Sequence, residues 1–248
     1  MEIRDGLSHI KTALLPSFAA IGGMAFPALI FIALGQHADA WAIVMPTDVV
    51  LALAALALAG KKINPSIRLF LMTLAVADDA LSLAVIAIFY RSDLDVSSAF
   101  YTIGAAAIGG LIPGRAHLEK FLAPTVTYLV IPVYIAVNIF GALEIQSLIT
   151  GTSMAVVFSR VLGKVVGITS FTFIGARVFN LQLPSAMNYR EVFGVSLLCG
   201  MGMTVSLVIA EITISDAGTL SQIRSGLFIA ALISGLLGAL WLRRSPAF

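Results

Sequence analysis

The sequence predicts an all-α membrane protein, a polytopic helical bundle of about eight transmembrane helices that forms a single domain over residues 1–248. Three observations predict this class: 59% of the residues are hydrophobic, only 11% are charged, and apolar runs of about twenty residues follow one another with short loops between them. A soluble domain carries about twice that charged fraction. Only helices and closed barrels satisfy their backbone groups inside lipid, and long apolar runs without alternation are helices.

The expected membrane spans, in chain order, are residues 13–35, 41–60, 66–90, 96–113, 124–143, 149–176, 190–213 and 219–242. When the N-terminus is placed in the cytoplasm, eleven of the fifteen Lys and Arg residues fall on the cytoplasmic side. The positive-inside rule therefore predicts that both termini are cytoplasmic. Because these basic residues lie in short loops between spans that are surrounded by membrane lipid, the net charge of +2 does not indicate a nucleic-acid partner.

The second expected span carries Pro46, Thr47 and Asp48 in the middle of an apolar run. Pro46 lacks a backbone donor and clashes with the preceding turn, so backbone carbonyls are freed there. Those carbonyls, the Thr47 hydroxyl and the Asp48 carboxylate are the oxygen ligands that a hard cation prefers. An ordinary proline kink with one polar residue facing a neighbour is the alternative, but a carboxylate in mid-membrane favours a functional site.

The third expected span carries two adjacent carboxylates, Asp78 and Asp79, with apolar residues on both sides. Neighbouring residues of a helix point about 100° apart, so the two cannot both face one ligand. The sixth span carries Lys164, which needs an acidic partner or loses its proton when it is buried. One of these aspartates is the natural partner, and a structural ion pair and a proton carrier both remain open. Arg160 lies one turn before Lys164, and snorkelling, a pair with Glu211 and a bond to a carbonyl all remain open for it.

The seventh expected span contains Gly200, Gly202 and Thr204 within the run LLCGMGMTVSLVIAE. Such a run predicts either close packing through small residues or a place where the helix unwinds. Two interrupted apolar segments at corresponding positions indicate the binding site of a secondary transporter, so the break at Pro46 favours unwinding here.

Several segments resemble the NhaA family of sodium/proton antiporters: FAAIGGMAFPALIF, WAIVMPTDVVLALAALAL, IRLFLMTLAVADDALSLAVIAIFY, VLGKVVGI and LLCGMGMTVSLVIA. The resemblance covers nearly the whole chain, and its motifs occur in family order. It differs in length, because the family has about twelve spans. The first two are expected to have no counterpart here, and a second deletion is expected near residues 104–113. The family's Gly-Lys-Pro reads Gly163-Lys164-Val165, and Arg160 replaces an apolar residue.

The resemblance implies a truncated inverted repeat with two discontinuous helices, supported here by Pro46, Gly200, Gly202 and Thr204. It implies that Asp79 and Asp48, with Thr47, bind Na+ or protons, and that Asp78 pairs with Lys164. Glu119 falls in the region that senses cytoplasmic pH. Several family members work as dimers, so a homodimer is expected, and no cofactor is expected beyond the transported Na+, Li+ and H+.

The leading hypothesis is exchange of Na+ or Li+ for H+ across a bacterial cytoplasmic membrane, with no enzymatic activity. The first alternative is a non-transporting remnant of the family or a partner membrane subunit. The second is an intramembrane aspartyl protease, since two aspartates in adjacent helices can share a proton and activate water. That protease's Gly-x-Gly-Asp run is absent around Asp48 and Asp78, which weakens the second alternative.

Overall fold

The computed structural model describes residues 2–35, 38–60, 64–90, 147–184 and 187–244, together with three single residues between 125 and 133. The expected spans 96–113 and 124–143, and the proposed pH-sensing residue Glu119, lie outside the described residues. No strand is present in the part of the chain that the structure describes. The fold of that part is therefore all-α, as the sequence predicts.

Eight helices make up the described ranges. They are α1 (Glu2–Ala33), the 3-10 helix η1 (Ala38–Val44), α2 (Val49–Leu58), α3 (Pro65–Phe89), α7 (Gly151–Val178), α8 (Tyr189–Leu198), α9 (Thr204–Thr213) and α10 (Ala217–Arg243). Four of them contain a stretch long and apolar enough to cross a membrane, namely 13–33, 65–89, 151–178 and 217–243. The second and seventh expected spans each form two short helices instead, η1 with α2 and α8 with α9. The first helix also begins earlier than its expected apolar span, at Glu2.

Polar side chains fix where the membrane helices begin. Asn64 caps α3 by accepting from the Ser66 N–H, and Pro65 follows it at the first helical position, where a missing N–H costs nothing. Asn188 and Glu191 form a reciprocal capping box at the start of α8.

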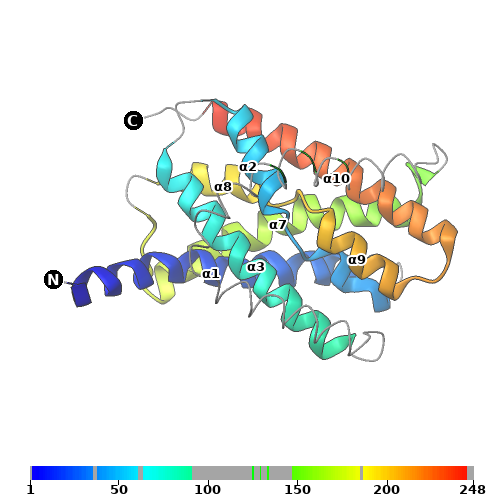
Figure 1. The fold of residues 1–248 in the computed structure, drawn as a ribbon, viewed down its shortest axis with the longest axis horizontal. Coiled ribbons are helices and arrows are strands. Elements are labelled where there is room, and N and C mark those ends of the chain that lie inside the picture. The colour runs from blue at the N-terminus through cyan, green and yellow to red at the C-terminus, as the bar shows by residue number, and fades with distance from the viewer. Residues whose placement is uncertain are drawn as a thin grey trace.

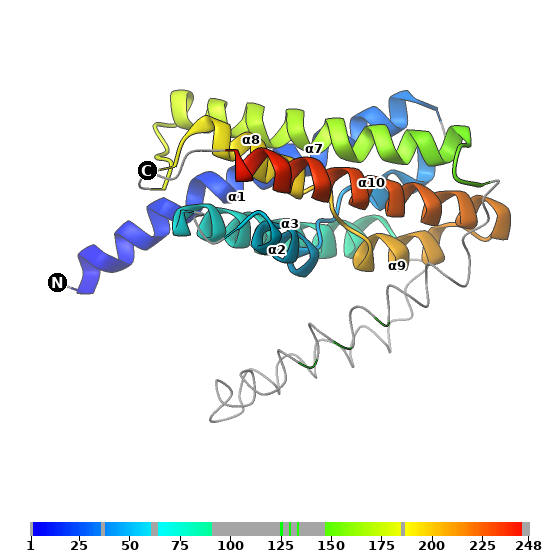
Figure 2. The same cartoon turned by 90° about the horizontal axis from the view of Figure 1, so that it is seen from above.

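Helices α1 and α7 pack with their backbones almost in contact. A side-chain carbon added at Gly22 would meet the Gly167 carbonyl, and one added at Gly167 would meet the Gly22 carbonyl. Membrane helices have no hydrophobic drive toward one another in lipid, so close packing through small residues holds them together. Figure 2 shows α7 along one face of the bundle and α2, α3 and α9 along the opposite face.

Two clusters of buried apolar residues occupy different levels of the bundle. One cluster contains buried residues of the 67–74 segment of α3 together with Ile168 of α7. The other contains Ile86 of α3 together with residues 155–156 of α7. The charged residues Asp78, Arg160 and Lys164 fall between these levels, and all three are fully buried. A charged layer thus lies at mid-depth between two apolar ones.

Large apolar side chains cover much of the outer surface of the described residues. Leu58 is 82% exposed, Ile88 70% and Leu236 63%. Exposure on this scale is unfavourable in water and ordinary in lipid, because hydrocarbon solvates these side chains. The chain is therefore a multi-pass membrane protein with a helical bundle.

Candidate functional site

The break in the second expected span lies between η1 and α2. The 3-10 helix ends at Val44, residues 46–48 are not helical, and Asp48 caps the N-terminus of α2 by accepting a hydrogen bond from the Leu51 N–H through its Oδ1, at 3.3 Å. A carboxylate at this position is favoured by the unsatisfied N–H groups of the helix start. The other carboxylate oxygen of Asp48, Oδ2, is buried and has no hydrogen-bond partner among the described residues.

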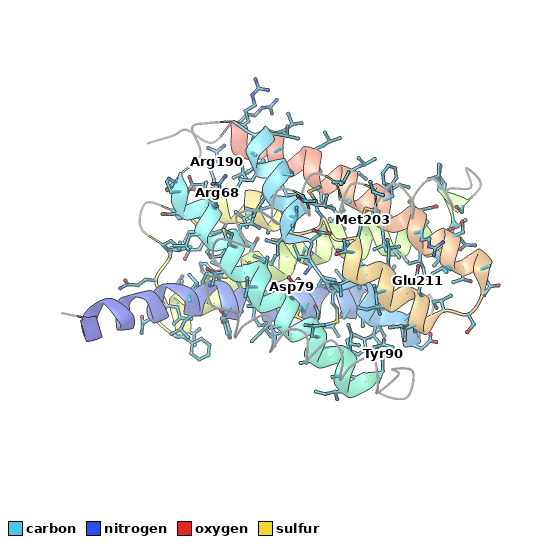
Figure 3. All side chains as sticks on the ribbon, viewed as in Figure 1. Arg68, Asp79, Tyr90, Arg190, Met203 and Glu211 are labelled. Carbon is cyan, nitrogen blue, oxygen red and sulfur yellow. The ribbon has the colours of Figure 1, made fainter. Side chains whose placement is uncertain are left out.

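The break in the seventh expected span lies directly against the first. Helix α8 ends at Leu198, and residues 201–203 are not helical. The Thr47 hydroxyl donates to the Cys199 carbonyl at 3.0 Å, and the Asp48 backbone N–H donates to the Met201 carbonyl at 2.8 Å. The two interrupted segments therefore meet at their breaks and are joined there by direct hydrogen bonds; this meeting point is called the crossing below. In Figure 3, Met203 marks the start of α9 near the middle of the bundle.

Arg160 connects the two breaks, and its place there was not singled out from the sequence. Its Nη1 donates to the Ile43 carbonyl at 3.1 Å and to the Ser206 hydroxyl at 2.8 Å. Its Nη2 donates to the Pro46 carbonyl and its Nε to the Gly200 carbonyl. A side-chain carbon at Gly202 would meet the Arg160 guanidinium and the Pro46 carbonyl, so the crossing leaves no room for one.

Of the three options that the sequence left open for Arg160, the structure shows the bond to carbonyls. A pair with Glu211 is wrong, because Glu211 forms its ion pair with Arg224 at 2.8 Å, on the partly exposed side of α9 and α10. Arg160 does not snorkel either, since it is fully buried. The signal in the sequence was an arginine in the middle of an apolar span, four residues before a buried lysine.

Lys164 pairs with Asp78, the partner that the family resemblance implies. The ammonium nitrogen lies 3.0 Å and 3.2 Å from the two carboxylate oxygens, and both side chains are fully buried. Loss of either partner of such a pair would leave an uncompensated charge in the protein interior. Asp78 therefore forms a contact between α3 and α7 through this ion pair.

Asp79 is the aspartate of the adjacent pair that does not bind Lys164 in the structure. It is only partly buried, and the charges of Asp78, Asp48 and Lys164 all act on its carboxyl group. Figure 3 shows Asp79 on the middle of α3, the helix that crosses the bundle obliquely in Figure 1. Thr47, Asp48, Asp78, Asp79 and Lys164 thus lie in one region of the structure, with Gly200 and Gly202 at the crossing and Thr204 at the start of α9.

The oxygen atoms around the two breaks are the potential ligands of an ion. No group of three His, Cys, Asp or Glu side chains suited to a metal ion occurs among the residues with described positions. What the site offers instead is two carboxylates, one of them with an unsatisfied oxygen, beside a hydroxyl and backbone carbonyls. Oxygen atoms of these kinds are the ligands that a hard cation accepts.

Comparison with known proteins relates this chain to sodium/proton antiporters. The family model described as Na+/H+ antiporter 1 matches residues 2–115 and 113–242. The Na(+)/H(+) antiporter NhaA of Vibrio cholerae is 31% identical over 303 residues, which cover 98% of this chain and 79% of the relative. That of Salmonella arizonae is 28% identical over 298 residues, which cover 97% of this chain and 77% of the relative.

Both alignments are longer than the chain of 248 residues, so the relatives contain segments with no counterpart here. The two matches to the family model meet at residues 113–115, close to the position where the sequence predicts a deletion. On the extent of these matches, the chain belongs to the Na+/H+ antiporter 1 family, as a shortened member.

Proposed function

We propose that this protein exchanges Na+ or Li+ for H+ across a bacterial cytoplasmic membrane and so serves pH and sodium homeostasis. Family membership supports the transport reaction, and the relatives are named for it. The observation that carries the proposal to these residues is the buried Oδ2 of Asp48 at the crossing of two helix breaks, which has no hydrogen-bond partner in the described part of the chain. A carboxylate oxygen without a partner is costly in a protein interior, and a proton or a cation relieves that cost.

In this mechanism Asp48 and Asp79 take either a cation or protons, and competition for the same oxygens couples the two fluxes. The Thr47 hydroxyl gives its hydrogen to the Cys199 carbonyl, so its oxygen keeps lone pairs for a cation. The Asp78–Lys164 pair holds α3 against α7 beside the site. Alternating access then moves the site between the two aqueous sides, and transport needs no cofactor and no catalytic chemistry.

The finer architecture belongs to the same proposal. We take η1 with α2, and α8 with α9, as two discontinuous membrane helices of a truncated inverted repeat. Half-helix ends at mid-membrane supply partial charges for ion binding, as transporters of this kind use them. Both termini are placed in the cytoplasm, and a homodimer in membrane lipid is the expected assembly. Glu119 is proposed to sense cytoplasmic pH.

Sodium-dependent proton movement in inside-out vesicles tests this function. Vesicles from cells that lack their own antiporters are acidified by respiration, and a pH-sensitive dye reports proton efflux when Na+ or Li+ is added. The native protein should dissipate the proton gradient, and Asp79→Asn should not. Glu211→Gln is the matched control, because it also removes one carboxylate charge but lies in a partly exposed pair with Arg224. Full exchange in Asp79→Asn would refute the assignment.

The two alternatives lack support. A non-transporting remnant predicts native vesicles without any cation response, and the same assay detects that outcome directly. An intramembrane aspartyl protease predicts cleavage of membrane-embedded peptides, whereas the relatives found are named as antiporters.

A further inference from the structure

A groove runs along the surface of the bundle between α2 and α10. Its bed is formed by small residues, namely Ala55, Ala59, Ala231 and Gly235, and exposed leucines of both helices form its rims. The groove has a volume of about 270 Å³, and Arg243 is the one charged side chain among the described residues that line it. The side chains of the proposed ion site lie elsewhere, so this groove is a separate feature of the molecule.

The groove reaches from mid-depth in the bundle to one end of it. Its deep end lies at Met201, in the break between α8 and α9, where the Met201 sulfur lies against Gly235. Its other end lies at Arg243, the last residue of α10, which follows Ala231 by twelve positions. That stretch of helix measures about 18 Å at about 1.5 Å per residue, and one leaflet of a bilayer core about 30 Å thick measures about 15 Å. The groove therefore has the length of a single leaflet.

Exposed arginines gather at the end of the bundle where the groove reaches the membrane surface. Arg243 and Arg244 end α10, and Arg68 and Arg190 lie in the first turns of α3 and α8. Figure 3 shows Arg68 and Arg190 at the end of the bundle where α10 ends in Figure 1. Basic residues at a membrane surface attract acidic lipid headgroups, and the positive-inside rule assigns this end to the cytoplasm. The charge at this end of the groove thus complements a phosphate group.

The membrane supplies an occupant that fits these features. Leu58 and Leu236 on the rims are 82% and 63% exposed, so the groove opens toward hydrocarbon. A second transmembrane helix packed there would need a seat across the whole membrane, whereas the groove covers one leaflet. We propose that the groove binds one acidic phospholipid of the cytoplasmic leaflet, with an acyl chain along the bed of small residues and the phosphate at Arg243. A guanidinium pairs with a phosphate in a bidentate, charge-assisted contact.

The bound lipid contacts the crossing at the deep end of the groove. Met201, which forms that end, accepts the hydrogen bond from the Asp48 backbone N–H with its carbonyl, at 2.8 Å. The acyl chain therefore packs on the residue that joins the two breaks. Dispersion contacts from the chain support this segment, which is not helical and lacks the hydrogen bonds of a regular helix.

Photolabelling tests the site without any use of transport. Purified protein is placed in nanodiscs of phosphatidylcholine that contain a small share of phosphatidylglycerol with a diazirine near the end of one acyl chain, and labelled peptides are mapped by mass spectrometry. We expect label at Met201 and at residues 231–235 of α10. It should exceed the label from a phosphatidylcholine with the same diazirine chain by about fivefold. Equal labelling by the two lipids, or label spread evenly over α10 and the exposed face of α3, would overturn the inference.

Two variants assign the label to the groove. Arg243→Gln removes the charge at the surface end and should lower labelling by phosphatidylglycerol about fivefold. Arg177→Gln is its control, because it removes an exposed arginine in the last turn of α7, which lies on the face opposite to α2 in Figure 2.

Ala239→Phe fills the groove and should abolish the label, whereas Ala87→Phe on the exposed surface of α3 should leave it unchanged. Labelling that survives both Arg243→Gln and Ala239→Phe overturns the inference. If Ala239→Phe fails to fold, Arg243→Gln and its control still decide.

Failure of the lipid site and failure of the proposed function give different results. Sodium-dependent proton flux in a native protein whose groove is not preferentially labelled refutes the lipid site and leaves the exchange standing. A native protein that is labelled in the groove but shows no such flux refutes the exchange and leaves the lipid site standing. Complete absence of label from the groove, as expected if another protein segment covers it, also refutes the lipid site.

Discussion

At the scale of single residues, the Asp78–Lys164 pair offers a test of stability that is separate from transport. Removing one partner of a buried ion pair leaves an uncompensated charge, so Lys164→Met should destabilise the protein by about 3–5 kcal/mol. The double variant Asp78→Asn with Lys164→Met removes both charges and should recover most of that loss. Thermal unfolding in detergent measures both. A double variant no more stable than the single one would contradict the pairing.

The bond from Thr47 to the Cys199 carbonyl can be tested by an isosteric change. Thr47→Val keeps the shape and removes the donor, which leaves a buried carbonyl unsatisfied at a cost of about 1–3 kcal/mol. Thr73→Val is the matched control, because the Thr73 hydroxyl bonds to Leu69 within its own helix on an exposed surface. A lower melting temperature is expected for the first variant and almost no change for the second. Equal effects would show that the crossing bond contributes little.

The sequence was enough to identify the charged residues of this region but not all of their contacts. The charges at Asp48, Asp78, Asp79 and Lys164 stand out because apolar residues surround them, and periodicity alone says that the two adjacent aspartates point apart. The structure agrees, with Asp78 buried in a pair and Asp79 partly exposed. Three of the four partners of Arg160 were beyond sequence reasoning, because they are backbone carbonyls and carbonyls carry no residue signature. Those of Ile43 and Pro46 also lie more than a hundred residues away in the chain.

At the scale of helices, the crossing of the two breaks depends on Gly202. Gly202→Ala should weaken it, because the added methyl group would meet the Pro46 carbonyl and the Arg160 guanidinium, and overpacking of this kind costs about 1–3 kcal/mol. Gly218→Ala is the control, since only the Asp216 carboxylate comes near and the position is exposed in the first turn of α10. There the change should be neutral or stabilise slightly. Vesicle exchange and melting temperature should both fall for Gly202→Ala only.

The close approach of α1 and α7 gives a second test at this scale. Gly167→Val places a branched side chain against the Gly22 carbonyl and should separate the two helices. The expected result is a lower melting temperature and loss of folded protein in the membrane fraction. If Gly167→Val were as stable as the native protein, the two backbones would not lie as close as described.

Helix positions were predictable and helix interruptions only in part. The four long described helices match expected spans because composition and length decide them. Pro46 and the glycines indicated where the other two spans are interrupted. The extent of each break was not predictable, since η1 and the non-helical residues 201–203 are stabilised by contacts between the breaks rather than by local propensity.

At the scale of the whole molecule, the start of α1 and the end of α10 lie at the same end of the bundle in both Figure 1 and Figure 2. The end of α10 carries Arg243 and Arg244, which the positive-inside rule assigns to the cytoplasm. A green fluorescent protein fused at the C-terminus should therefore fluoresce, and a C-terminal alkaline phosphatase fusion should be inactive. The reverse pair of results would invert the orientation.

The hydrogen bond between Asp48 and Met201 has a mechanical consequence. Its donor and acceptor are both peptide groups, so side-chain replacement leaves it intact, and only a proline at position 48 would remove the donor. A hinge that opened between the interrupted segments would have to break this link on every turnover. The segments should instead travel together as one rigid piece, with sliding confined to the surfaces around them.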